Sequence, residues 1–179
     1  MIRNDSQTWG SVARALHWSI ATLIGIQLSL GWIGGEMARS PAKVNLMTAH
    51  KSLGLTVLAL VVLRILWRWT NVTPQPPERS PRWEILAAKA SHLVLYLLLV
   101  AVPLSGWTAA STSAIPWKFW WLAPLPNFLE PQPDLHEVAG EVHEALVTTF
   151  LVVLGVHVVA ALRHHFLKRD RVLMRMWRG

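Results

Sequence analysis

The chain has 179 residues, of which 53% are hydrophobic and only 15% charged. Its apolar residues gather in runs of about 20, long enough to cross a ~30 Å hydrocarbon core, which predicts an integral membrane protein. The net charge of +7 does not indicate nucleic-acid binding, because basic residues beside apolar spans are explained by membrane topology, and the lack of cysteine excludes iron–sulfur clusters, disulfides and covalently attached haem.

Four membrane-spanning helices are predicted, joined by short connections. Prolines between the second and third spans, among them Pro74 and Pro81, forbid a continuous helix there, and Pro103 is expected to kink the third span. The linker before the fourth span is rich in tryptophan, which suits a stretch at the membrane interface. We expect one all-α domain over residues 1–179, an integral membrane four-helix bundle whose first span is retained as an anchor. The expected spans cover about residues 15–33, 50–69, 85–109 and 140–162.

The positions of lysine and arginine predict how the bundle is oriented. Basic residues are concentrated before the first span, between the second and third, and after the fourth, so both termini are expected to be cytoplasmic. The expected location is the bacterial inner membrane, with the opposite side facing the periplasm. On the cytoplasmic side we count Arg3, Arg14, Arg64, Arg68, Arg79, Arg82, Lys89, Arg163, Lys168, Arg169, Arg171, Arg175 and Arg178, and on the other side only Arg39, Lys43, Lys51 and Lys118.

Histidines within the predicted spans are the most informative residues, because imidazoles are costly in hydrocarbon and are usually functional there. His143 and His157 are fourteen residues apart, so they lie about 21 Å apart on nearly the same face of one helix. His50 and His143 are expected near the outer face, whereas His17 and His157 lie in the inner half. The sequence thus predicts two sites with two histidines each, suited to stacked planar cofactors. The alternatives are interfacial or helix-start histidines that only form hydrogen bonds.

Arg64 and His92 are the other candidate cofactor-binding residues. Arg64 follows His50 by fourteen residues, which puts it at the depth of His157, where a haem propionate would need a cation. His92 begins the inner part of the third span and would either replace His17 as a ligand or form a hydrogen bond to a propionate.

Three glycines accompany the candidate ligands. Gly54 lies one turn after His50, and Gly140 and Gly155 flank the fourth-span histidines. They indicate either a groove for a flat macrocycle or ordinary close packing of membrane helices.

The order of short motifs resembles the bacterial cytochrome b-561 family over essentially the whole chain. The motifs are ARALHW, AHKSLG, LVVLRILWRW with a proline-rich loop, SHLVLYLLLVAVPLSGW, VHEAL and GVHVVAAL. The resemblance implies a four-helix inner-membrane protein with two non-covalent haem b groups, and its motifs carry the ligand positions over to His17, His50, His143 and His157. It implies superoxide oxidation coupled to ubiquinone reduction or, in related cytochromes, electron relay between a dehydrogenase or hydrogenase and quinone.

Three residues are then candidates for catalysis. Lys51, beside His50, would attract superoxide together with other outer basic residues. His164 and His165 would supply protons to ubiquinone or a similar quinone near the cytoplasmic end, or would form only an interfacial pair. The expected partners are superoxide, a quinone and membrane lipid, with a dehydrogenase partner in the relay interpretation. A haem-free transporter or scaffold is the third hypothesis.

Overall fold

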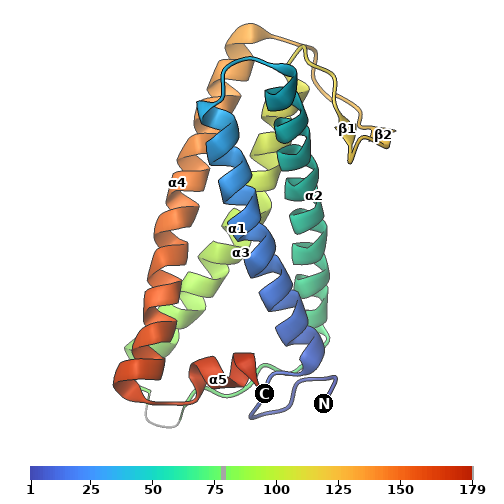
Figure 1. Cartoon of the computed structure of the whole chain (residues 1–179). Coiled ribbons are helices and arrows are strands. Elements are labelled where there is room, and N and C mark those ends of the chain that lie inside the picture. The colour runs from blue at the N-terminus through green and yellow to red at the C-terminus, as the bar shows by residue number, and fades with distance from the viewer. Residues whose placement is uncertain (78–79, 179) are drawn as a thin grey trace.

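The computed structural model describes residues 1–77 and 80–178 and contains four long helices in an up-down-up-down arrangement (Figure 1). These are α1 (Ser11–Glu36), α2 (Pro41–Trp69), α3 (Arg82–Ser111) and α4 (Pro133–Arg163). All four are long and apolar enough to cross a membrane. The predicted all-α class and the four spans are confirmed, while Arg79 of the predicted cytoplasmic set lies outside the described residues.

All four helices begin before their predicted spans, and α2 and α4 do so by the widest margins. The Ser40 hydroxyl accepts a hydrogen bond from the Lys43 amide at 3.2 Å, and Pro41 occupies the first turn of α2. Pro133 has the same place at the start of α4. A serine cap and a proline in the first turn both favour a helix start, so His50 and His143 lie well inside their helices rather than at the beginning.

The bundle is built from two tightly packed helix pairs. In one apolar cluster, Ile20 of α1 packs with Val57 and Val61 of α2, and in the other, Leu95 and Leu98 of α3 pack with Phe150 of α4. α2 and α3 join the two pairs, whereas α1 and α4 have no extensive contact within the described residues. The α1–α4 side is therefore the least closed side of the bundle.

Both chain termini lie at one end of the bundle, which we call the terminal end (Figure 1). There α4 continues as a π-helix, η1 (His164–Lys168), and the short helix α5 (Val172–Trp177) lies across the end. Trp18 of α1 donates from Nε1 to the Met176 carbonyl at 2.9 Å, and Arg14 donates to the Trp177 carbonyl at 3.3 Å. α5 is thereby joined to the first helix of the chain.

At the opposite end, which we call the hairpin end, the linker after α3 forms two short antiparallel strands, β1 (Lys118–Phe119) and β2 (Ala123–Pro124). The Trp120 amide donates to Ser52 Oγ at 2.9 Å, and its indole Nε1 donates to Thr56 Oγ1 at 3.1 Å. Trp120 and Trp121 have positive φ angles of 47° and 60°. Such angles are costly for residues other than glycine, so the contacts to α2 must stabilise this turn.

Candidate functional site

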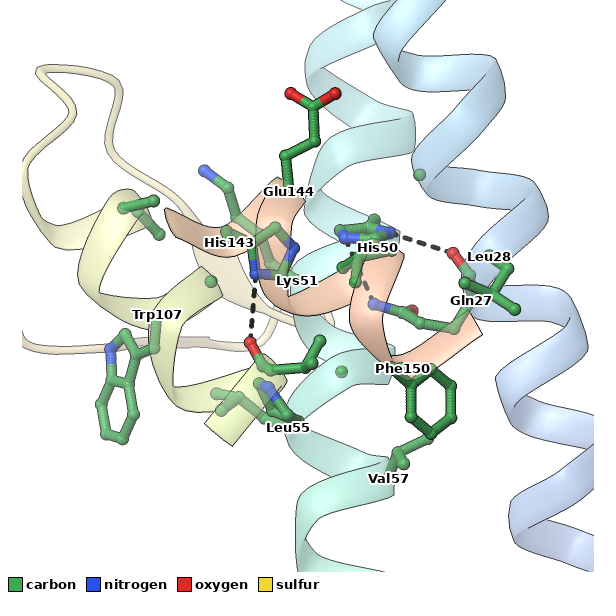
Figure 2. A pocket seen from close by; sticks show the side chains of 18 of the residues that line it. Gln27, Leu28, His50, Lys51, Leu55, Val57, Trp107, His143, Glu144 and Phe150 are labelled. Atoms are coloured by element: carbon green, nitrogen blue, oxygen red, sulfur yellow. Dashed lines mark hydrogen bonds between the residues drawn. The ribbon is translucent and has the colours of Figure 1, made fainter. Parts of the chain in front are cut away.

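His50 of α2 and His143 of α4 face each other near the hairpin end, with ring centroids 6.5 Å apart and planes at 87° (Figure 2). A metal binds an imidazole nitrogen at about 2.0 Å, so two rings on opposite sides of one metal have centroids about 6.4 Å apart. The observed separation matches that arrangement. We call these two residues the hairpin-end pair.

The backbone of α1 fixes the orientation of the His50 ring. Its Nδ1 lies 3.2 Å from the Gln27 carbonyl oxygen. A carbonyl can only accept, so Nδ1 carries the proton and Nε2 keeps its lone pair. The Gln27 side-chain amide lies 3.3 Å from this Nε2, a contact that a metal on Nε2 would displace (Figure 2).

The His143 ring is held in the same way by α3. Its Nδ1 lies 3.1 Å from the Val102 carbonyl and 2.9 Å from Ser105 Oγ. The Ser105 hydroxyl donates its own proton to the Val102 carbonyl at 2.8 Å, so its oxygen accepts from Nδ1. Both rings of the hairpin-end pair thus have an unprotonated Nε2, the form that ligates a metal while the other nitrogen is hydrogen-bonded.

Two glycines make these ring positions possible. A Cβ atom on Gly31 would lie 2.9 Å from Cε1 of His50, and one on Gly106 would lie 3.0 Å from Cε1 of His143. Each glycine follows by one turn the residue whose carbonyl accepts from the ring. Each imidazole therefore occupies a notch at a glycine, and an added Cβ would force the ring to shift.

Sequence reasoning missed these two glycines, which lie on the helices opposite the histidines. The repeated dipeptides Gly31-Trp32 and Gly106-Trp107 were the only signal. Among the glycines singled out from sequence, Gly140 and Gly155 have no neighbouring group within 4 Å of an added Cβ and do not line the cavity beside His50, whereas Gly54 lines it next to the Gln27 amide.

A cavity of about 690 Å³ adjoins the hairpin-end pair and is lined by side chains from all four long helices. Its volume lies within the range of cofactor sites, and its lining is mostly apolar, as such sites usually are. No cluster of three or more histidine, cysteine or acidic residues that could hold a metal occurs within residues 1–77 and 80–178. A metal between His50 and His143 would need its remaining ligands from elsewhere. The four ring nitrogens of a haem would supply them, so the residues present fit this group.

A second histidine pair lies toward the terminal end. The rings of His17 of α1 and His157 of α4 have centroids 6.5 Å apart, the same separation as in the hairpin-end pair. We call them the terminal-end pair. His92 of α3 is nearer to His157, at 5.4 Å between centroids. That distance is too short for one metal between His92 and His157, so the geometry favours His17 over His92 as the partner of His157.

Arg64 lies near the terminal-end pair but is held by protein groups. Its Nε donates to Tyr96 Oη at 3.0 Å, and its Nη1 donates to the Ala13 carbonyl at 3.2 Å. Arg68, one turn later, lies over the Tyr96 ring at 5.9 Å from the centroid. Two guanidinium groups therefore flank one tyrosine, and Arg64 retains donors for an anion such as a propionate.

Lys51 lines the same cavity as His50 and is half-buried rather than freely exposed. Its Nζ lies 5.5 Å from the centroid of the buried Trp117 ring, a cation–π contact with the linker. Arg39 and Lys118 are exposed, and the Lys43 ammonium donates to the Met37 carbonyl at 2.8 Å. The predicted outer cations thus share one end of the bundle, but only Lys51 reaches the cavity.

His164 and His165 lie on η1 at the terminal end. His164 Nδ1 is 2.5 Å from Asp170 Oδ2, and the His165 ring contacts Phe166 at 4.7 Å between centroids. Sequence reasoning missed Asp170. His136, in the first turn of α4, bonds the Ala109 carbonyl through Nδ1 at 2.9 Å.

Comparison with known proteins identifies the family of the chain. The sequence model of a family described as prokaryotic cytochrome b561 matches residues 8–179. Cytochrome b561 homolog 2 of Escherichia coli K12 is 32% identical over 97% of this chain and 93% of its own length. The probable superoxide oxidase CybB of Yersinia pestis is 29% identical over 90% of each chain. The chain therefore belongs to the prokaryotic cytochrome b561 family, multi-pass bacterial membrane proteins that bind haem b and transfer electrons.

Proposed function

We propose that this protein holds two haem b groups, one on the hairpin-end pair and one on the terminal-end pair, and carries electrons from superoxide to a quinone. The equal 6.5 Å separation of the two histidine pairs is the observation that carries the proposal. His143 and His157 would each ligate a different haem from the same face of α4. The bound haems supply reversible one-electron redox chemistry, which no side chain of this chain offers without them.

We further propose that the hairpin end faces the periplasm and the terminal end the cytoplasm of a cell with an inner membrane. The basic residues near the terminal end support this orientation. Lys51 would attract the superoxide anion toward His50, with Arg39 and Lys118 extending the positive field. The probable superoxide oxidase among the relatives agrees with this donor.

The electron balance requires two superoxide anions for each quinone. Each superoxide gives up one electron and leaves as dioxygen, and the quinone takes up two electrons and two protons. His164 and His165 would deliver protons at the terminal end. The Asp170 carboxylate, 2.5 Å from His164 Nδ1, would hold this ring in place.

Haem content and haem reduction together test this function. Purified wild-type protein should contain two haems by pyridine haemochrome assay, His143→Ala should lose the hairpin-end haem, and His157→Ala the terminal-end haem. His165→Ala is the matched control for haem content, because His165 lies on η1 and belongs to neither histidine pair, and it should keep both haems. Superoxide should reduce the bound haem in stopped-flow mixing. When quinone is present, quinol should form as superoxide is consumed. A protein that holds two haems but ignores superoxide would instead relay electrons from a dehydrogenase docked at the hairpin end.

A further inference from the structure

The two histidine pairs have the same ring separation but different surroundings. At the hairpin end, both imidazoles donate from Nδ1 to protein oxygens: the Gln27 carbonyl for His50, and the Val102 carbonyl with Ser105 Oγ for His143. At the terminal end, the hydrogen bonds within residues 1–77 and 80–178 involve none of the three rings, and the nearby donors belong to Arg64.

From this asymmetry we propose that the hairpin-end site has the lower reduction potential and the terminal-end site the higher one, so that the protein itself sets the direction of electron flow. The proposal rests on the two-haem function above. It assigns Ser105 as a positioning residue that acts on the metal through His143.

Hydrogen bonding at Nδ1 is the first reason. An imidazole that donates to an oxygen acceptor becomes a more basic ligand, and a more basic ligand stabilises the oxidised metal. His143 has two such acceptors and His50 has one. The glycine notches at Gly31 and Gly106 keep both rings close enough to the neighbouring helix for these bonds.

Fixed positive charge is the second reason. The Arg64 guanidinium lies within electrostatic reach of His17 and His157, and Arg68 within reach of His92. A nearby cation favours the reduced metal centre, which carries one positive charge fewer, and so raises the potential.

Lys51 is a cation near the hairpin-end pair, and its charge alone would raise the reduction potential of that site. Its ammonium is stacked on Trp117, and the carboxylate of Glu144, beside His143, supplies a charge of opposite sign at the same end. Two cations close to the terminal-end pair, Arg64 and Arg68, against one partly offset cation in the cavity of the hairpin-end pair leave the predicted order of potentials unchanged.

Ser105 allows a test, because its acceptor is a side chain. Ser105→Ala removes one oxygen from His143 Nδ1 and leaves the Val102 carbonyl in place. Ser105→Thr keeps a hydroxyl and should restore the bond. Thr108→Ala is the matched control, because the Thr108 hydroxyl bonds only the Leu104 carbonyl of its own helix.

The experiment is a redox titration of the purified holoprotein, followed by visible absorption and by electron paramagnetic resonance of the ferric haems. We expect two transitions in the wild type. Ser105→Ala should raise only the lower one, Ser105→Thr and Thr108→Ala should match wild type, and Arg68→Gln should lower only the higher one. A shift of the higher transition by Ser105→Ala, or no shift by either variant, would overturn the proposal.

The titration uses chemical mediators and needs neither superoxide nor quinone. A protein that ignores superoxide but shows the expected shifts would retain this inference and lose the proposed donor. A protein that reacts with superoxide but shows unshifted potentials would keep the function and lose the inference. A haem content of one per chain would remove the two-haem basis of both.

Discussion

A methyl group added to Gly31 would lie 2.9 Å from Cε1 of His50, closer than two carbon atoms can pack. The ring cannot retreat without lengthening its bond to the Gln27 carbonyl, which is already 3.2 Å long. Gly31 and Gln27 of α1 thus fix the position of the His50 ring on α2.

Gly31→Ala should therefore reduce haem occupancy at the hairpin end and shift its absorption, because overpacking typically costs about 1–3 kcal/mol. Gly25→Ala, on the same helix, meets nothing within 4 Å and serves as the control. The haem content per protein should be measured for both variants. Equal haem loss in the two variants would mean that replacing a glycine disturbs the α1 helix in general, and not the position of His50 in particular.

Tyr96 is expected to stabilise the terminal end through Arg64. Tyr96→Phe removes the acceptor for Arg64 Nε and should lower the free energy of unfolding by about 1–3 kcal/mol, as for other hydrogen bonds to charged groups. Arg64→Leu removes the cation as well and should also lower the higher reduction potential. Thermal unfolding in detergent and a redox titration separate the two effects. Tyr96→Phe should leave the potentials close to wild type if Arg64 stays in place.

Salt should slow the reaction with superoxide if the outer cations steer the anion. Replacing Lys51, Arg39 and Lys118 by glutamine should slow haem reduction and weaken its salt dependence, since the Debye length is ~10 Å at 0.1 M ionic strength. Lys89→Gln removes one charge from an exposed lysine near the start of α3, away from the hairpin end, and as a control for position it should behave as wild type. A stopped-flow rate that changes neither with salt nor with the three outer replacements would rule out steering.

The docking of the hairpin on α2 depends on Ser52, whose buried hydroxyl accepts from the Trp120 amide. Ser52→Ala should speed hydrogen exchange at Trp120 and through the linker, because the strained turn loses an anchor. Ser29→Ala removes an exposed hydroxyl that bonds only the Gly25 carbonyl and should leave linker exchange unchanged. Hydrogen–deuterium exchange of the linker, measured by mass spectrometry, tests this prediction. Unchanged protection at Trp120 in Ser52→Ala would contradict the role of this contact.

The sequence was sufficient for the long-range arrangement of the histidines. The fourteen-residue spacing of His143 and His157 fixes their separation along one helix, and the order of spans then places His50 and His17 at the matching depths. It was not sufficient to choose between His17 and His92, because that depends on the relative rotation of α1 and α3. The ring centroids are 6.5 Å apart for His17 and His157 and 5.4 Å apart for His92 and His157, and these separations require the three-dimensional structure.

Contacts between helices were harder still to predict. The notches at Gly31 and Gly106 depend on how neighbouring helices are aligned along their axes. The spacing of residues within one helix carries no information about this alignment. The starts of α2 and α4 were missed for a local reason: Pro41 and Pro133 precede the strongly apolar residues, and hydropathy alone marks only the latter. Asp170 was missed because its link to His164 crosses a left-handed turn at Arg169.

The attachment of α5 to α1 uses two backbone oxygens of α5 together with one side chain, because the Trp177 ring stands edge-on to the Trp18 ring at 5.0 Å between centroids. Trp18 and Arg14 bond the carbonyls of Met176 and Trp177, and every amino acid at those positions offers the same acceptor. Side-chain changes at Met176 should therefore be tolerated, whereas removing the last few residues would expose the ring of Trp18, which stands edge-on to His17 at 5.2 Å. α5 thus covers the Trp18 side of the terminal-end pair through its backbone at Met176 and through both the backbone and the ring of Trp177.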